Sequence, residues 1–213
     1  MRAELRDLRR LNTWFGGTRA VVQALTPVFA RHSGRRLTFL DVGTGAGDIP
    51  SAARRVAARF GVTLRVIGVE RIPAAAAVAA QADLIPVLAD GGALPFPPGS
   101  VDIVCISQVL HHLPREVAVR WIAGVDRIAR VAVVLADLHR TWPAMLGLWL
   151  VSFVMRLHPA TRHDGVLSLR RGYTKGDLTG MLREAGVNGL AYYAPIARIA
   201  AVWEPTVTSH AHR

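Results

Sequence analysis

The sequence of 213 residues contains a single cysteine, Cys105, and a single lysine, Lys175. One cysteine cannot form a disulfide within the chain, which excludes a disulfide-stapled secreted scaffold and a cysteine-based zinc site. Charged residues make up only 19% of the chain and hydrophobic residues 51%, so the chain is not disordered. A chain of this length buries about 70% of the surface that its unfolded form exposes, enough for one domain without staples.

Long hydrophobic runs are also missing. The N-terminus contains no apolar run of signal-peptide length, so export is not expected and the predicted location is cytoplasmic. The most apolar stretch, residues 142–155, is shorter than the roughly 20 residues that span a bilayer. We predict a buried or half-buried helix there, and the alternatives are a helix that lines an apolar substrate pocket or makes peripheral contact with a membrane.

Positive charge is in excess, with a formal net charge of +11. Residues 1–36 carry 8 cations and 2 acids, residues 37–105 carry 5 and 6, and residues 106–213 carry 13 and 7. The excess therefore lies outside the middle of the chain. It is typical of an anionic partner such as nucleic acid, a membrane surface or an acidic substrate, and the near-exclusive use of arginine is explained equally well by genomic composition.

Short apolar runs alternate with helical patterns along most of the chain, which predicts a parallel sheet with helices on both faces. The predicted strands are residues 37–42, 64–69, 85–89, 101–107, 131–136, 190–193 and 196–203. The predicted helices are residues 4–15, 18–31, 46–60, 74–81, 114–129, 142–155 and 174–185, with a basic loop over residues 158–173. We expect an N-terminal helical cap over residues 1–36, one domain over residues 37–205 and a frayed tail over residues 206–213.

A glycine-rich turn follows the first predicted strand, at residues 41–48 with the sequence Asp-Val-Gly-Thr-Gly-Ala-Gly-Asp. Its spacing is G-x-G-x-G, whereas the dinucleotide fingerprint is G-x-G-x-x-G, and the adjacent acids suit a ligand with an ammonium group better than a pyrophosphate. Glu70 and Asp90 end the next two predicted strands. Ligands of open α/β sheets bind at these carboxyl ends, so the three places predict one nucleoside site.

These segments, together with residues 100–113, resemble the class I S-adenosylmethionine-dependent methyltransferases. The resemblance implies a Rossmann-like seven-stranded sheet with an antiparallel last strand, and S-adenosylmethionine as the cofactor. The residues that it implies for cofactor binding are Asp41, Gly43, Gly45, Gly47, Glu70, Arg71, Asp90, Gly91, Ser107 and Gln108. One departure is that the family's proline-glycine-glycine turn before the fifth strand is missing from residues 126–131.

A narrower resemblance rests on residues 11–17, 110–113 and 162–173. These look like methyltransferases of quinone biosynthesis and methyltransferases found beside type III polyketide synthases. The resemblance implies secondary metabolism and a small phenolic or quinone-like polyketide substrate, lipophilic if it carries an alkyl chain.

Methyl transfer to a phenol needs a group that removes the phenolic proton, because a phenol has a pKa near 10. Histidine is readily tuned for this role. The candidate bases are His111, His139 and His163, and the candidate substrate-binding residues are His112, Asp137 and Asp164. Each histidine can equally be a hydrogen-bonded structural residue, and Asp137 could orient His139. No cluster of acids suggests a metal site.

Other functions fit the residues less well. The turn after the fourth strand lacks the Pro-Pro-aromatic motif of amino-group methylation, and Cys105 lies inside a strand, so a nucleic-acid substrate is disfavoured. Asp48 replaces the glycine that an NAD-dependent oxidoreductase would need. We predict O-methylation of a small hydroxylated aromatic, with C-methylation of a quinone-like ring as the alternative. RNA methylation and a non-catalytic cofactor-binding partner remain further alternatives.

Overall fold

The computed structural model describes residues 16–80, 83–154 and 159–205. The predicted helix over residues 4–15 and the predicted tail over residues 206–213 lie outside these ranges. The strands are β1 (Arg36–Val42), β2 (Thr63–Glu70), β3 (Ile85–Leu88), β4 (Val101–Ser107), β5 (Ala129–Leu138), β6 (Leu190–Ala194) and β7 (Arg198–Trp203). The helices are α2 (Gly17–Arg31), α3 (Asp48–Ala58), α4 (Pro73–Ala79), the short 3₁₀ helix η2 (Leu110–His112), α5 (Arg115–Ile128), α6 (Trp142–Val154), α7 (Pro159–Arg171) and α8 (Lys175–Glu184).

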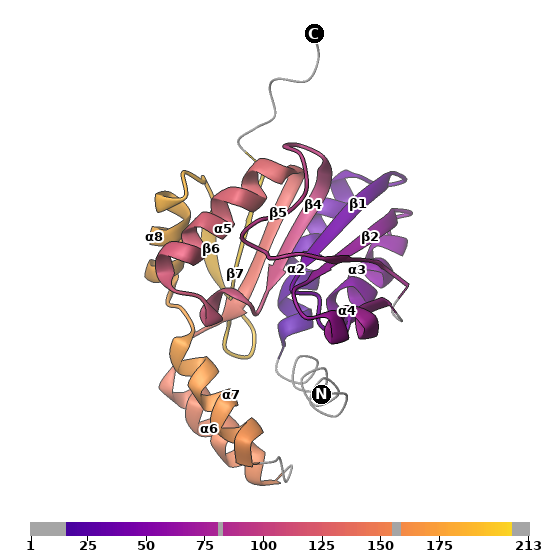
Figure 1. Ribbon diagram of the computed structural model, residues 1–213. Coiled ribbons are helices and arrows are strands. Elements are labelled where there is room, and N and C mark those ends of the chain that lie inside the picture. The colour runs from indigo at the N-terminus through magenta and orange to yellow at the C-terminus, as the bar shows by residue number, and fades with distance from the viewer. Residues whose placement is uncertain (1–15, 81–82, 155–158, 206–213) are drawn as a thin grey trace.

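The strands form one seven-stranded sheet in the order β3-β2-β1-β4-β5-β7-β6 (Figure 1). Strands β1 to β5 run parallel, whereas β7 runs antiparallel to both of its neighbours. The predicted fold, a Rossmann-like mostly parallel sheet with helices on both faces, is confirmed. All seven predicted strands are present, each beginning and ending within two residues of its predicted bounds.

Helices cover both faces of the sheet because the central strands are apolar on both faces. Every residue of β4 is buried. On one face α2 and α3 pack against side chains such as Phe39 and Val134. On the other, α5 and α8 pack against Leu40 and Leu135. Helix α2, part of the predicted N-terminal cap, thus lies directly on the sheet. Within the described residues, no helix has the length and apolar character needed to cross a membrane.

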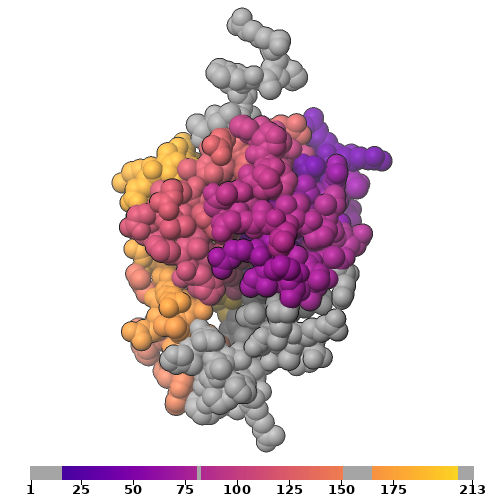
Figure 2. All heavy atoms as spheres, viewed as in Figure 1, coloured from indigo at the N-terminus to yellow at the C-terminus, as the bar shows by residue number. Residues whose placement is uncertain are grey.

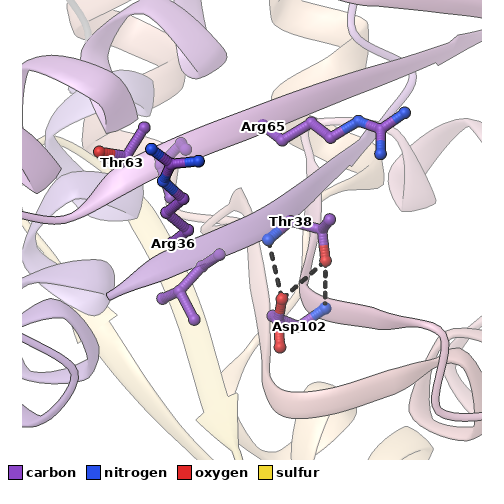
Figure 3. A pocket seen from close by; sticks show the side chains of 7 residues that line it. Arg36, Thr38, Thr63, Arg65 and Asp102 are labelled. Carbon is purple, nitrogen blue, oxygen red and sulfur yellow. Dashed lines mark hydrogen bonds between the residues drawn. The ribbon is translucent and has the colours of Figure 1, made fainter. Parts of the chain in front are cut away.

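The amino ends of β1, β2 and β4 border a hollow lined partly by Arg36 and Arg65 (Figure 3). Beside it, the Asp102 carboxylate accepts hydrogen bonds from the Thr38 backbone N–H and hydroxyl, both at 2.8 Å, and from the Arg130 guanidinium at 2.6 Å. Burial opposes ionisation of Asp102, but these hydrogen bonds outweigh it and lower its pKa. Because its carboxylate is engaged in this way, Asp102 fastens β1 to β4.

The segment predicted as a basic loop, residues 158–173, is largely helical, so this prediction was wrong. Helix α7 covers Pro159–Arg171 and lies alongside α6, and the two form a pair that projects from the sheet (Figure 1). A Cβ built on Gly165 would lie 3.0 Å from Leu148 Cδ2 of α6. Because Gly165 has no side chain, the two helices can approach closely. This packing stabilises α7, although the polar composition of residues 159–171 gives no helical hydrophobic pattern in the sequence.

Candidate active site

The glycine turn connects β1 to α3 at the carboxyl edge of the sheet. Gly43, Gly45 and Gly47 all have positive φ, at 76°, 52° and 72°, which L residues adopt only with strain. The N–H groups of Gly43 and Thr44 both donate to the Val69 carbonyl, at 2.9 and 3.1 Å, and hold the turn against the end of β2. A Cβ on Gly45 would meet no atom within 4 Å, so a ligand can approach the backbone there.

A buried carboxylate, Asp41, lies at the base of this turn with 2% of its surface exposed. Burial raises its pKa from 3.8 to about 7, and the nearby carboxylates of Asp48 and Glu70 act in the same direction. Among the described atoms, Asp41 Oδ2, Thr44 Oγ1 and Ser107 Oγ are buried without a hydrogen-bond partner. Buried polar atoms are usually paired, so these three fit a site for a ligand that carries donors and positive charge.

Glu70 ends β2 and is hydrogen-bonded to the turn, because its Oε1 accepts from the Gly45 N–H at 2.8 Å. Arg71 follows it and is exposed. The predicted nucleoside-binding residues of β1 and β2 are thus brought into contact, although 25 residues separate Gly45 from Glu70.

Asp90 follows β3, and its Oδ1 accepts from the Gly92 N–H at 2.8 Å. A Cβ on Gly91 would lie 2.2 Å from the Trp121 ring, which comes from α5. Position 91 therefore needs glycine for close packing, and Trp121 forms an aromatic wall beside the predicted adenine-binding residues. This tryptophan was missed in the sequence, where the glycine pair was the sole local sign of a close approach.

Ser107 and Gln108 end β4 next to the glycine turn. Gln108 has a φ of 57° and donates its backbone N–H to the Ala136 carbonyl at 2.8 Å. Its side chain lies against the start of α2, since a Cβ on Gly17 would come within 2.5 Å of Gln108 Nε2. Beside it, a Cβ on Gly43 would meet Val109 at 2.6 Å. The turn after β4 therefore packs tightly against both neighbouring segments.

A short buried hydrogen bond at this edge joins His111 of η2 to Asp137 of β5. His111 Nδ1 donates to Asp137 Oδ1 at 2.6 Å, and the His111 backbone N–H reaches Asp137 Oδ2 at 3.3 Å. The Leu138 N–H also donates to Asp137, at 2.7 Å. His111 is 6% exposed and Asp137 is 1% exposed. Because the Asp137 carboxylate accepts from Nδ1, the neutral form of this imidazole carries its lone pair at Nε2.

His112 follows His111 directly, and His139 lies two residues after Asp137. The His112 ring contacts the His111 ring in a tilted arrangement, with centroids 4.0 Å apart. Partial burial and then the charge of His111 lower the pKa of His112, while the charge of Asp137 opposes this. His139 contacts the Tyr193 ring in a tilted arrangement with centroids 4.3 Å apart, and burial lowers the pKa of His139. The suggestion that Asp137 orients His139 is not supported, since its imidazole partner is His111.

His163 and Asp164 lie in α7, and their side chains are outside the described part of the structure. The end of α7 is attached to the site: the Tyr173 N–H donates to the Leu138 carbonyl at 2.8 Å. Burial, with the charge of Asp137, raises the pKa of the Tyr173 hydroxyl. Tyr173 was missed as a site residue because nothing in its local sequence marks the approach to β5.

Arg198, at the start of β7, is a second missed residue. It is 5% exposed, its Nε has no hydrogen-bond partner among the described atoms, and burial lowers its pKa to about 10 while the charge of Asp137 opposes this. A lone arginine in an apolar strand was the available sign in the sequence. Within the described residues, no group of three or more His, Cys, Asp or Glu side chains could hold a metal ion.

Residues 40–132 match a family model described as a methyltransferase domain. No curated protein matches the chain significantly. Among solved structures, the chain is similar to an S-adenosylmethionine-dependent methyltransferase from Aquifex aeolicus, with 13% identity and a TM-score of 0.65 over 94% of this chain and 96% of that one.

Two further structures have the same fold. One is magnesium protoporphyrin IX methyltransferase from Synechocystis with bound S-adenosylhomocysteine: 20% identity, TM-score 0.58, 88% of this chain and 83% of that one. The other is human N-acetylserotonin methyltransferase in complex with S-adenosylmethionine: 15% identity, TM-score 0.63, 93% of this chain and 53% of that one. Residues 40–132 thus match a methyltransferase domain, and the chain has the fold of S-adenosylmethionine-dependent methyltransferases.

Proposed function

We propose that the protein is an S-adenosylmethionine-dependent methyltransferase and that it methylates a hydroxyl group of a small aromatic molecule, of the phenol or polyketide type. The observation that carries this proposal is the buried His111–Asp137 pair, with its 2.6 Å hydrogen bond, three residues after Gln108. A phenol needs to lose its proton as its oxygen attacks, and a histidine oriented by a carboxylate is suited to take it. In this arrangement the proton passes to His111 Nε2, and Asp137 stabilises the resulting imidazolium.

The carboxyl edge would hold the cofactor through the predicted residues. When bound, S-adenosylmethionine would supply an electrophilic methyl group: a nucleophile would attack its carbon in line with the S–C bond, and S-adenosylhomocysteine would leave as a neutral thioether. The unpaired Oδ2 of Asp41 suits its positive charge, and Thr44 and Ser107 offer hydroxyl groups. Glu70 and Asp90 end adjacent strands, where they can accept from ribose hydroxyls and an adenine amino group.

A label-transfer assay tests the acceptor. The enzyme is incubated with S-adenosylmethionine labelled with carbon-13 in the methyl group and with separate panels of phenols, hydroquinones and RNA, and the products are analysed by nuclear magnetic resonance. We expect the label on a phenolic oxygen. Label on ring carbon would replace this proposal by C-methylation, and label only in RNA would refute the small-molecule proposal.

A further inference from the structure

The helix α6 presents an apolar face to solvent. Trp142 is 73% exposed, Leu146 47%, Trp149 47% and Leu150 51%. At 100° per residue these four side chains fall within one third of the helix circumference. We call them the α6 face. Single exposed apolar residues are ordinary, but a contiguous group of large ones marks an interaction site.

The opposite side of α6 is occupied by its partner helix. Leu148 packs toward Gly165 of α7, and Ala144, Met145 and Gly147 are half-buried. Figure 1 shows the α6–α7 pair standing away from the sheet, and in Figure 2 the same pair, in salmon and orange, lies below the body of the molecule. The two helices therefore pack against each other on one side of α6, and the side chains of the α6 face are 47–73% exposed on the other.

The charges around the α6 face favour an anionic partner. Helix α6 contains no charged residue, whereas the sequence of residues 140–171 contains five arginines and one acid, Asp164. One of these arginines, Arg140, is ion-paired with Asp177 at 2.9 Å. Arg170 and Arg171 at the end of α7 are exposed. An apolar face with tryptophans and flanking arginines is the pattern of a helix that lies in a lipid headgroup region. The thirteen residues of α6 are fewer than the roughly 20 that cross a bilayer.

We propose that the α6 face docks on the surface of a membrane that contains anionic lipid. Docking there places the active-site edge toward the bilayer. Helix α6 begins three residues after His139, and the end of α7 is hydrogen-bonded to β5 through Tyr173 and Leu138. A lipophilic methyl acceptor could then enter directly from the membrane. The docking itself does not depend on which acceptor is used.

Vesicle sedimentation tests this proposal on the full chain. Wild-type protein is compared on vesicles of phosphatidylcholine alone and of equal parts phosphatidylcholine and phosphatidylglycerol. We expect partition onto the anionic vesicles that weakens with added salt, because lipid charge contributes. The double variant Leu146→Gln/Leu150→Gln should lower this partition at least about tenfold, since two half-exposed leucines lose their apolar contact with lipid. The matched control is Leu190→Gln on β6, whose leucine is 78% exposed.

The outcomes separate the occupants of the α6 face. Partition that is lost in the double variant and kept in the control supports membrane docking. Wild-type protein that stays off anionic vesicles, or a double variant that binds them equally well, overturns it. Light scattering adds a further readout: a wild-type dimer that the double variant dissociates, without vesicle binding, would assign the face to a second copy of the chain. Calorimetric binding of S-adenosylmethionine by each variant verifies that the fold is intact.

Discussion

The buried carboxylate of Asp41 should reduce the stability of the protein and strengthen cofactor binding. Its pKa is about 7 instead of 3.8, so its ionised form costs the cofactor-free folded state about 4 kcal/mol. Replacement by asparagine removes this cost but leaves a buried amide that lacks partners, which costs about 1–2 kcal/mol. Asp41→Asn should therefore stabilise the cofactor-free protein by about 2–3 kcal/mol above pH 7.

The sign of the pH dependence follows from the raised pKa. Between about pH 4 and 7 the folded state holds a proton on Asp41 that the unfolded state has released, so wild-type stability falls as the pH rises. The variant lacks this dependence, and its advantage should shrink as the pH falls from about 7 to about 4. The same proton competes with a cationic ligand, so wild-type affinity for S-adenosylmethionine should weaken below pH 7 by up to about tenfold per pH unit.

Urea unfolding of both proteins across this pH range, with and without S-adenosylmethionine, measures the effect. Groups far from Asp41 titrate equally in the two proteins and cancel in the difference, whereas Asp48 and Glu70 interact with Asp41 and contribute to it. A stability difference that is the same at all pH values would refute the raised pKa. Unchanged cofactor affinity in Asp41→Asn at about pH 8, where wild-type Asp41 is ionised, would refute its contact with the cofactor's charge.

Three further predictions concern the turn and the sheet. Gly45→Ala should cost about 1 kcal/mol of stability, because Gly45 has a positive φ. It should lower cofactor affinity at least about tenfold, because the added Cβ enters open space that the ligand needs. Calorimetry measures the affinity, and urea unfolding measures the stability. Gly43→Ala should cost about 2–4 kcal/mol in the same unfolding assay, since its Cβ would also clash with Val109 at 2.6 Å; equal stability losses in the two variants would contradict this contrast. Asp102→Asn should lower the free energy of unfolding by about 1–3 kcal/mol at neutral pH. Because the pKa of Asp102 is lowered, this loss of stability should vanish in acid as the pH falls through that pKa. A loss that persists in acid would count against the ion pair with Arg130.

The sequence predicted the sheet well because its strands carry their own signal. Buried parallel strands appear as uninterrupted apolar runs, and β4, with all seven residues buried, is the clearest example. The bounds of β5 were less certain: the strand extends to Leu138 through its antiparallel pairing with Arg198, which no local pattern shows. Helix α7 was predicted as a loop for a related reason: it is stabilised by packing against α6, a tertiary contact that the sequence of residues 159–171 does not show.

The active-site edge was predicted in part. The glycine turn, Glu70 and Asp90 could be placed because they end consecutive strands. The pairing of His111 with Asp137 joins residues 26 positions apart and depends on how η2 folds back over the end of β5. Trp121 comes to Gly91 from α5 in the same way. These contacts are set by tertiary packing and have no local signature.

The most direct test of the proposed chemistry is the pH dependence of methyl transfer to a phenol by the wild type and by Asp137→Asn, with His139→Ala as the control. Asparagine in place of Asp137 would rotate the imidazole of His111 or favour the wrong tautomer, so we predict that kcat falls at least about 100-fold. Part of this loss should be restored as the pH rises, because the phenol then ionises without a base. The control should keep its turnover and pH profile. Full activity of Asp137→Asn at neutral pH would contradict the role of the His111–Asp137 pair.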